Sequence, residues 1–280
     1  MRDRWEYHPG ERAVQARAGV LDRADRVARI VTRDIEDVAA AFLAAQPMLV
    51  IGWADPGGRV WCSVVAGPPG FARATGPRTV TVAAQAPAGD PLAGLRGGDP
   101  IGLLAIEPAT RRRMRLNGVA RTAVDGSLVV EADEVLSNCP KYITRRDVAA
   151  AASARAALAA PRVTAGDRLS PAQVAAIAAA DTFFLATAAP GRGVDASHRG
   201  GGPGFVTATA DRLAWADAPG NAMFLSLGNL AVDPAAGILV IDWPTGATLQ
   251  LTGRAEVEWR GPDHRTIHFT VDEVRETRPG

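Results

Sequence analysis

The pattern of hydrophobic and polar positions predicts a chain made mostly of short strands. Continuous apolar runs, typical of buried strands, cover 48–53 and 182–188. Alternation over 249–259 predicts a strand whose Leu249 and Leu251 face the core while Gln250 and Thr252 face the other way, toward solvent. Further strands are predicted at 60–66, 79–84, 101–106, 113–122 and 128–135. With a helix opening each half, the pattern indicates a mainly β protein with flanking helices, an α+β fold.

The same pattern of hydrophobic and polar positions occurs twice along the sequence. Aligned without gaps, residues 44–75 and 178–209 share 13 identical residues in 32 positions, and weaker correspondences extend the repeat to 44–135 and 178–274. The turn sequences GPPGF (67–71) and GGPGF (201–205) are the strongest match. About six short strands per copy predict a small antiparallel barrel in each half. We expect the two barrels to pack about a pseudo-twofold axis, as a covalent version of a homodimer.

The repeat divides the chain into four predicted parts. Residues 1–30 form an N-terminal arm laid over the first half, and 31–146 are the first repeat. An alanine-rich helix and a linker occupy 147–169, and the second repeat covers 170–280. Ser170 followed by Pro171 is a typical helix start.

Composition excludes several classes of function. With 31 basic and 30 acidic residues among 280, the net charge of +1 favours neither nucleic acid nor an anionic membrane as partner. Cys62 and Cys139 are too few for a disulfide framework or a thiolate metal site, and no metal-ligand spacing is present. The longest apolar run is interrupted by Arg155, so no membrane span is predicted. These features predict a cytoplasmic protein.

Comparing the two copies separates architecture from chemistry. The glycine, proline and phenylalanine of the turn occur in both copies, so the turn is predicted to be architectural. Ser197-His198-Arg199 instead corresponds to Ser63-Val64-Val65, and Asn221 corresponds to Pro87. The second half therefore carries a polar site that the first half lacks. Burying an anion against two valines is costly, so we expect at most one such ligand per chain.

Three segments resemble a known family: ADTFFLATAAPGRGVDASHRGGGPGF, PGNAMFLSLGNLAVDPAAGILVIDW and LQLTGRAEVEW, which cover nearly all of 178–259. Their order and spacing resemble the FMN-binding split barrels related to pyridoxamine 5′-phosphate oxidase. SNCPKYITRR at 137–146 is similar to the segment that ends the first half of long, duplicated members. The resemblance implies two tandem split barrels with FMN at their interface.

The resemblance also implies which residues contact the cofactor. From the second half these are Ala196, Ser197, His198, Arg199, Trp215, Ala216 and Asn221, and from the first half Arg115, Lys141 and Tyr142. At Gly220-Asn221-Ala222 the chain lacks the cations that the family often places there. Arg199 would then be the main charge on the phosphate.

The implied activity is an FMN-dependent oxidoreductase acting on a small-molecule substrate or electron donor. No side chain is an obvious catalytic acid or base, and the residues that bind pyridoxal phosphate in the true oxidase have no match. Alternatives are a non-catalytic flavin-binding protein, or the same barrel with a deazaflavin coenzyme or with haem ligated by His198. A further homodimer is compatible with the repeat.

Individual residues also have simpler interpretations. Residues 197–199 could be a solvated strand edge, and Asn221 and Asn229 could be turn residues with left-handed backbone. Arg111 to Arg113 are interpreted as a solvated hairpin end. Lys141-Tyr142 could be a structural cap of the junction between the halves.

Overall fold

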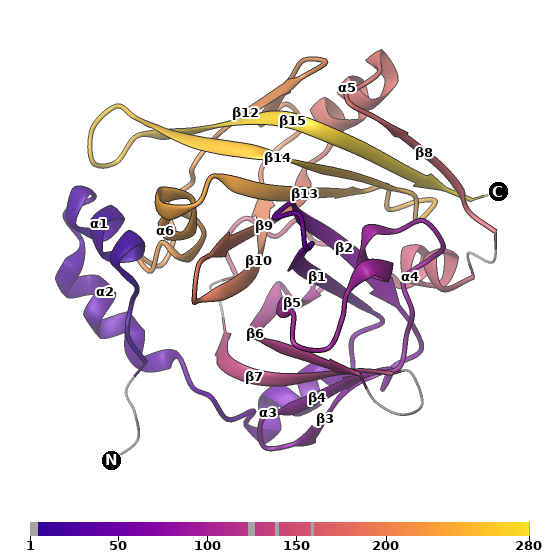
Figure 1. The fold of residues 1–280 in the computed structure, drawn as a ribbon, viewed down its shortest axis with the longest axis horizontal. Coiled ribbons are helices and arrows are strands. Elements are labelled where there is room, and N and C mark those ends of the chain that lie inside the picture. Colours follow the sequence, from indigo (N-terminus) through magenta and orange to yellow (C-terminus); the bar gives the residue numbers. More distant parts are fainter. Residues whose placement is uncertain (1–4, 123–126, 138–139, 158–159, 280) are drawn as a thin grey trace.

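Two antiparallel sheets accompanied by helices form the protein (Figure 1). The structure, a computed structural model, describes residues 5–122, 127–137, 140–157 and 160–279, so Cys139 lies outside it. The first sheet contains β1 (Met48–Ala54), β2 (Val60–Ala66), β3 (Ala72–Gly76), β4 (Thr79–Val82), β5 (Pro100–Glu107), β6 (Arg112–Thr122) and β7 (Leu128–Ser137). The second contains β8 (Arg162–Gly166), β9 (Thr182–Ala189), β10 (Gly193–Gly200), β11 (Val206–Ala208), β12 (Arg212–Ala216), β13 (Ala235–Ile241), β14 (Thr248–Trp259) and β15 (Arg265–Arg278).

Helices precede, join and cover these sheets. They are α1 (Pro9–Arg17), α2 (Leu21–Val27), α3 (Asp37–Ala44), α4 (Ala149–Ala156), α5 (Pro171–Ala179) and α6 (Leu225–Val232), with the short 3-10 turns η1 (Ala28–Ile30) and η2 (Pro91–Gly94). Helix α5 begins as predicted. The Ser170 side chain accepts a hydrogen bond from the Gln173 backbone amide, and the Gln173 side chain accepts one from the Ser170 backbone amide. No helix among the described residues is both long and apolar enough to cross a membrane.

The two sheets have the same strand order. It is β2-β1-β5-β6-β7-β4-β3 in the first sheet and β10-β9-β13-β14-β15-β12-β11 in the second. The sequence prediction missed β3 and β11, short strands that follow the glycine-proline turns. It was also wrong about part of the linker, since 162–166 forms β8, which pairs with β15.

Both glycine-proline turns are built alike. A Cβ placed on Gly67 would lie 2.7 Å from the Phe71 Cβ, and one on Gly201 would lie 2.6 Å from the Phe205 Cγ. Gly70 and its counterpart Gly204 have φ of 91° and 86°, and each amide donates a 2.7 Å hydrogen bond to a carbonyl of the preceding helix. These contacts support the architectural role predicted for the turn.

Where the halves meet, both faces of each sheet are buried. One face packs on the core of its own half. The other face packs against the opposite half, where β1, β2 and β5 meet β9, β10 and β13 in a shared apolar cluster. This second interface overturns the predicted solvent face of β14: Gln250 is 0% and Thr252 1% exposed, because β14 packs against β2. The Gln250 amide donates 2.8 Å to Ser63 Oγ across the interface.

Two glycines make reciprocal contacts between the halves. A Cβ on Gly102 would lie 2.6 Å from the carbonyl oxygen of Val194, and one on Gly237 would lie 2.6 Å from that of Val60. Gly102 corresponds to Gly237, and Val60 to Val194, in the repeat. Each half therefore uses the same glycine against the same strand of the other half, which is the contact pattern of a twofold interface.

The N-terminal arm lies on both halves, whereas contact with the first half alone was predicted: Trp5 Nε1 donates 2.7 Å to Glu134 of β7. Helix α1 packs against α6, and the chain then runs along α2 toward α3 in the first half (Figure 1). The arm thus bridges the two halves.

Candidate functional site

A cavity lies between the two halves. It encloses about 960 Å³ of empty space, including the part open to solvent, and its walls come from β6, 141–142, β10, β12, 217–224 and the start of α6. Eight of the ten residues singled out from the sequence line it: Arg115, Lys141, Tyr142, His198, Arg199, Trp215, Ala216 and Asn221. Their contact with a cofactor stays a prediction, but the fold brings them to one place.

The other two predicted residues lie behind the cavity wall. Ala196 is 0% exposed and belongs to the apolar cluster between the halves. Ser197, on the opposite face of β10, donates 3.1 Å to the Leu185 carbonyl and lies 3.2 Å from Ser226 Oγ. Neither side chain reaches the cavity. Ser197 is linked to the cavity lining only through its hydrogen bond with Ser226, which does line the cavity.

Positive charge dominates the described part of the cavity lining. Arg113, Arg115, Lys141 and Arg199 face a single carboxylate, Asp217. Asp217 is already paired, because Arg265 Nε lies 2.9 Å from its Oδ2 and both side chains are largely buried. The cavity therefore suits an anionic ligand.

Arg113 was misread from the sequence as part of a solvated hairpin end. It lines the cavity, and its Nη1 lies 3.1 Å from His198 Nδ1. The signal was available: Arg113 and Arg115 are two residues apart on one strand, so their side chains share a face.

His198 is held neutral in the cavity wall. Burial, followed by the charges of Arg113, Arg199, Arg115 and Arg146, lowers its pKa well below the ordinary value. A guanidinium can only donate, so Nδ1 accepts the Arg113 hydrogen bond and Nε2 carries the ring proton. His198 thus serves as a hydrogen-bond donor and adds no charge.

Arg115 connects the cavity with a buried polar pair. Its Nη1 lies 3.1 Å from both carboxylate oxygens of Asp195, and Asp195 Oδ2 accepts a 3.1 Å hydrogen bond from Ser226 Oγ. Two buried donors, Arg115 Nε and Trp215 Nε1, have no partner within the described part of the protein. Both belong to residues that line the cavity, which fits a ligand that carries hydrogen-bond acceptors.

Left-handed backbone is concentrated at this cavity. Tyr142, Ala222 and Phe224 have φ of 65°, 72° and 57°, and all three line it. Such non-glycine residues cost on the order of 1–3 kcal/mol each and gather at functional sites. Asn221 is not itself left-handed; its Oδ1 accepts the Met223 amide at 3.1 Å and so supports the turn.

Tyr142 ties the two sides of the cavity together. Its hydroxyl donates 3.1 Å to the Pro219 carbonyl, and its own carbonyl oxygen lies so close to Gly200 that no Cβ would fit there. The segment therefore joins the two halves, as the cap interpretation of Lys141-Tyr142 predicts, and it also lines the cavity, while its contact with a cofactor stays a prediction.

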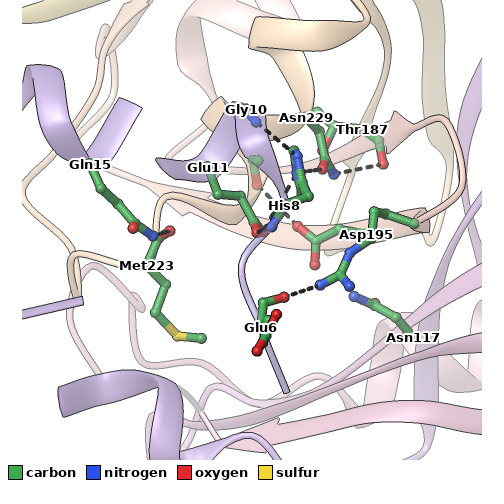
Figure 2. Close-up of polar contacts among 12 residues, drawn as sticks. Glu6, His8, Gly10, Glu11, Gln15, Asn117, Thr187, Asp195, Met223 and Asn229 are labelled. Atoms are coloured by element: carbon green, nitrogen blue, oxygen red, sulfur yellow. Dashed lines mark hydrogen bonds and ion pairs between the residues drawn. The ribbon is translucent and has the colours of Figure 1, made fainter. Parts of the chain in front are cut away.

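A buried polar cluster behind the cavity was not predicted from the sequence. Figure 2 shows His8 and Glu11 of the arm facing Asn229, Thr187 and Asp195. His8 Nε2 lies 3.1 Å from Asn229 Oδ1, and Asn229 Nδ2 donates 3.0 Å to Thr187 Oγ1. The turn interpretation of Asn229 is wrong, because this residue is buried within α6. No local pattern indicates that the arm reaches α6.

The raised pKa of Glu11 leads us to expect that the stability of the protein depends on pH. Burial, the largest cause, and the charges of Glu134 and Asp195 raise the pKa of Glu11 from 4.5 to about 8. The hydrogen bond from the His8 amide and the charge of Arg192 act in the opposite direction. The folded state holds this proton more tightly than the unfolded state does. The contribution of Glu11 to the free energy of unfolding is therefore complete below pH 4.5 and is lost as pH rises through 8. His8 acts oppositely: burial lowers its pKa from 6.5, so its contribution is lost only as pH falls below 6.5.

Between pH 6.5 and about 8 we therefore expect the free energy of unfolding to decrease with rising pH. Urea titrations at several pH values measure it. Glu11→Gln, which keeps an acceptor for the His8 amide but cannot ionise, should remove most of the decrease. An equally steep decrease in that variant would assign the effect to another group.

Helix α4 packs on residues that correspond, in the sequence repeat, to residues at or beside the cavity. It packs on β2, the counterpart of β10, and its Arg155 donates 3.1 Å to both Thr248 and Asp90. Asp90 also accepts a 2.6 Å hydrogen bond from Ser63, the counterpart of Ser197. Thr248 corresponds to Arg113 in the repeat.

Fold and cavity together define a class of mainly β protein with a cavity lined by basic side chains between two sheets of equal strand order. Residues 169–277 match the model of the pyridoxamine 5′-phosphate oxidase family, and this C-terminal part is a domain of that family. The match includes the β10, β12 and α6 residues of the cavity. No curated protein matches the sequence.

Solved structures similar to the chain correspond to part of it. A single-residue variant of HupZ from Group A Streptococcus is 9% identical, with 36% of this chain and 94% of that chain covered and a TM-score of 0.30. A Clostridium acetobutylicum protein related to general stress protein 26, described as of the pyridoxinephosphate oxidase family, is 13% identical (37% and 83% covered, TM-score 0.29). An FAD-binding protein from Mesorhizobium loti is 14% identical (41% and 97% covered, TM-score 0.29).

Proposed function

We propose that the chain is an FMN-binding flavoprotein and an oxidoreductase, with one cofactor in the cavity between its halves. The observation that carries this proposal is the cationic cavity between the pyridoxamine 5′-phosphate oxidase family domain and the first half, where, among the described residues, four basic side chains face one carboxylate that is already paired. When bound, FMN supplies hydride or electron transfer. The cytoplasm is the compartment that we propose for it.

The residues of the cavity fit a phosphate-bearing aromatic ligand. Arg199, on the strand that enters the glycine-rich turn, supplies the main phosphate charge, and the Nε2 proton of His198 adds a donor. Arg115 and Trp215 line the cavity, and their buried Nε and Nε1 atoms have no partner among the described residues. Tyr142 limits the opening of the cavity through its bond to Pro219.

Acid–base chemistry is not what these side chains provide. Asp217 is held by Arg265, Asp195 by Arg115, and the pKa of His198 lies too low for protonation at neutral pH. This suits transfer of hydride or electrons between a reduced donor and a small substrate. It also favours the second candidate, a flavin-binding protein without catalysis of its own. Haem is disfavoured, since His198 Nε2 carries the proton and Nδ1 is bonded.

We also propose that the two halves arose by duplication of one split barrel and are related by a pseudo-twofold axis. The equal strand orders and the reciprocal glycine contacts support this. Helix α4 then fills the second of two formerly equivalent sites, so each chain holds one flavin.

Arg199→Ala tests the assigned phosphate site. We expect FMN to bind about 1.5–3 kcal/mol more weakly, roughly 10- to 150-fold, because a hydrogen bond to a charged group is lost. Val65→Ala, the same position in the other copy, is the control and should leave FMN affinity unchanged. Fluorescence titration measures both, and the absorption spectrum separates flavin, deazaflavin and haem. Equal weakening in the two variants would show that the phosphate does not bind at Arg199.

A further inference from the structure

One side chain of the N-terminal arm reaches the cavity wall from behind. Gln15 in α1 is 0% exposed, and its Nε2 donates a 2.9 Å hydrogen bond to the Met223 carbonyl, 208 residues away in sequence (Figure 2). Helix α1 can approach this closely because two glycines meet: a Cβ on Gly10 would collide with the Gly228 carbonyl oxygen. Gln15 is thereby fixed at the loop before α6.

The residue that Gln15 holds lies in the most strained part of the cavity wall. Met223 stands between Ala222 and Phe224, both with left-handed backbone and both lining the cavity. Its amide is bound by Asn221 Oδ1 and its carbonyl by Gln15 Nε2. Strained backbone persists only where its surroundings hold it in place. The two bonds hold the peptide groups on both sides of Met223.

We propose that Gln15 is a positioning residue, which holds loop 220–225 in the shape that receives the ligand. The arm is therefore part of the binding site although it does not line the cavity. This inference rests on the proposed function for the identity of the ligand, whereas the restraint on the loop does not depend on it. Without the Gln15 bond, the loop relaxes away from its left-handed conformation and the cavity wall loses its form.

Gln15→Met tests this proposal, since methionine keeps the length of the side chain and removes the donor. Tyr7→Phe is the matched control, because it removes a hydrogen bond of the same arm, from Tyr7 to the Ala24 carbonyl, and keeps the ring that packs beside Met223 and Leu225. Hydrogen–deuterium exchange of the ligand-free protein is measured for peptides covering 217–228 and for β1. We expect at least tenfold faster exchange at 217–228 in Gln15→Met and no change in Tyr7→Phe or in β1.

FMN affinity is the second readout, with at least tenfold weaker binding expected in Gln15→Met alone. Unchanged exchange at 217–228 would overturn the positioning role, even if the wild type binds FMN. Faster exchange in a protein whose wild type binds no FMN would leave the restraint established and refute the proposed ligand. If Gln15→Met fails to fold, Gln15→Leu, which also removes the donor and stays apolar, replaces it.

Discussion

Replacing Arg155 by methionine is expected to destabilise the protein by about 3–5 kcal/mol, the largest effect among the substitutions considered. The Arg155 and Asp90 side chains are 1% and 0% exposed and pair at 3.1 Å, so the variant leaves a carboxylate buried without its counter-charge. Denaturant unfolding measures the loss. Asp90→Asn in the same variant should restore much of the stability, because asparagine is neutral and still accepts the Leu92 amide.

The surface pair Arg121 and Glu131 provides the control. Both side chains are 58% exposed at a separation of 3.3 Å, so Arg121→Met should change stability by no more than about 1 kcal/mol. A loss in Arg155→Met as small as this would show that α4 is not held in the first-half site by the ion pair.

Gly102→Ala is expected to cost about 3 kcal/mol of stability, and Gly237→Ala about the same. In each case the new methyl group would lie 2.6 Å from a backbone carbonyl oxygen of the other half, which cannot rotate away as a side chain would. Gly202→Ala is the control, because a Cβ there meets open space and its φ is not positive. Thermal and denaturant unfolding of the three variants measure the costs.

The equality of the first two losses is the informative part. It follows from a pseudo-twofold contact, in which each half uses the same glycine against the same strand. A large loss at one glycine and none at the other would contradict that symmetry.

Sequence reasoning could predict the repeat, because buried strands and turn glycines leave local signals. The GPPGF and GGPGF turns and the apolar run at 48–53 needed no knowledge of the other half. It failed where burial depends on tertiary contacts: the polar side of β14 looks solvated, yet Gln250 is buried by β2. An alternating pattern alone cannot show that a polar face meets another sheet.

The candidate site was predicted to a similar extent. Comparing the copies found His198 and Arg199, since polar residues stand there against valines. Gln15 and Arg155 could not be found, because each acts across the fold through a contact far away in sequence. Asp195 stood within the quoted motif and Arg115 was among the predicted residues, but the ion pair between them is visible only in the structure.

A titration of the ligand-free protein with FMN, followed by flavin absorbance and by calorimetry, counts the cofactors that each chain holds. We predict saturation at one equivalent of FMN per chain, with the second copy of the site filled by α4. Arg155→Met and Asp90→Asn together should not create a second tight site, because Val64 and Val65 still offer no donors to a phosphate. Two tight equivalents per wild-type chain, or none, would contradict the account.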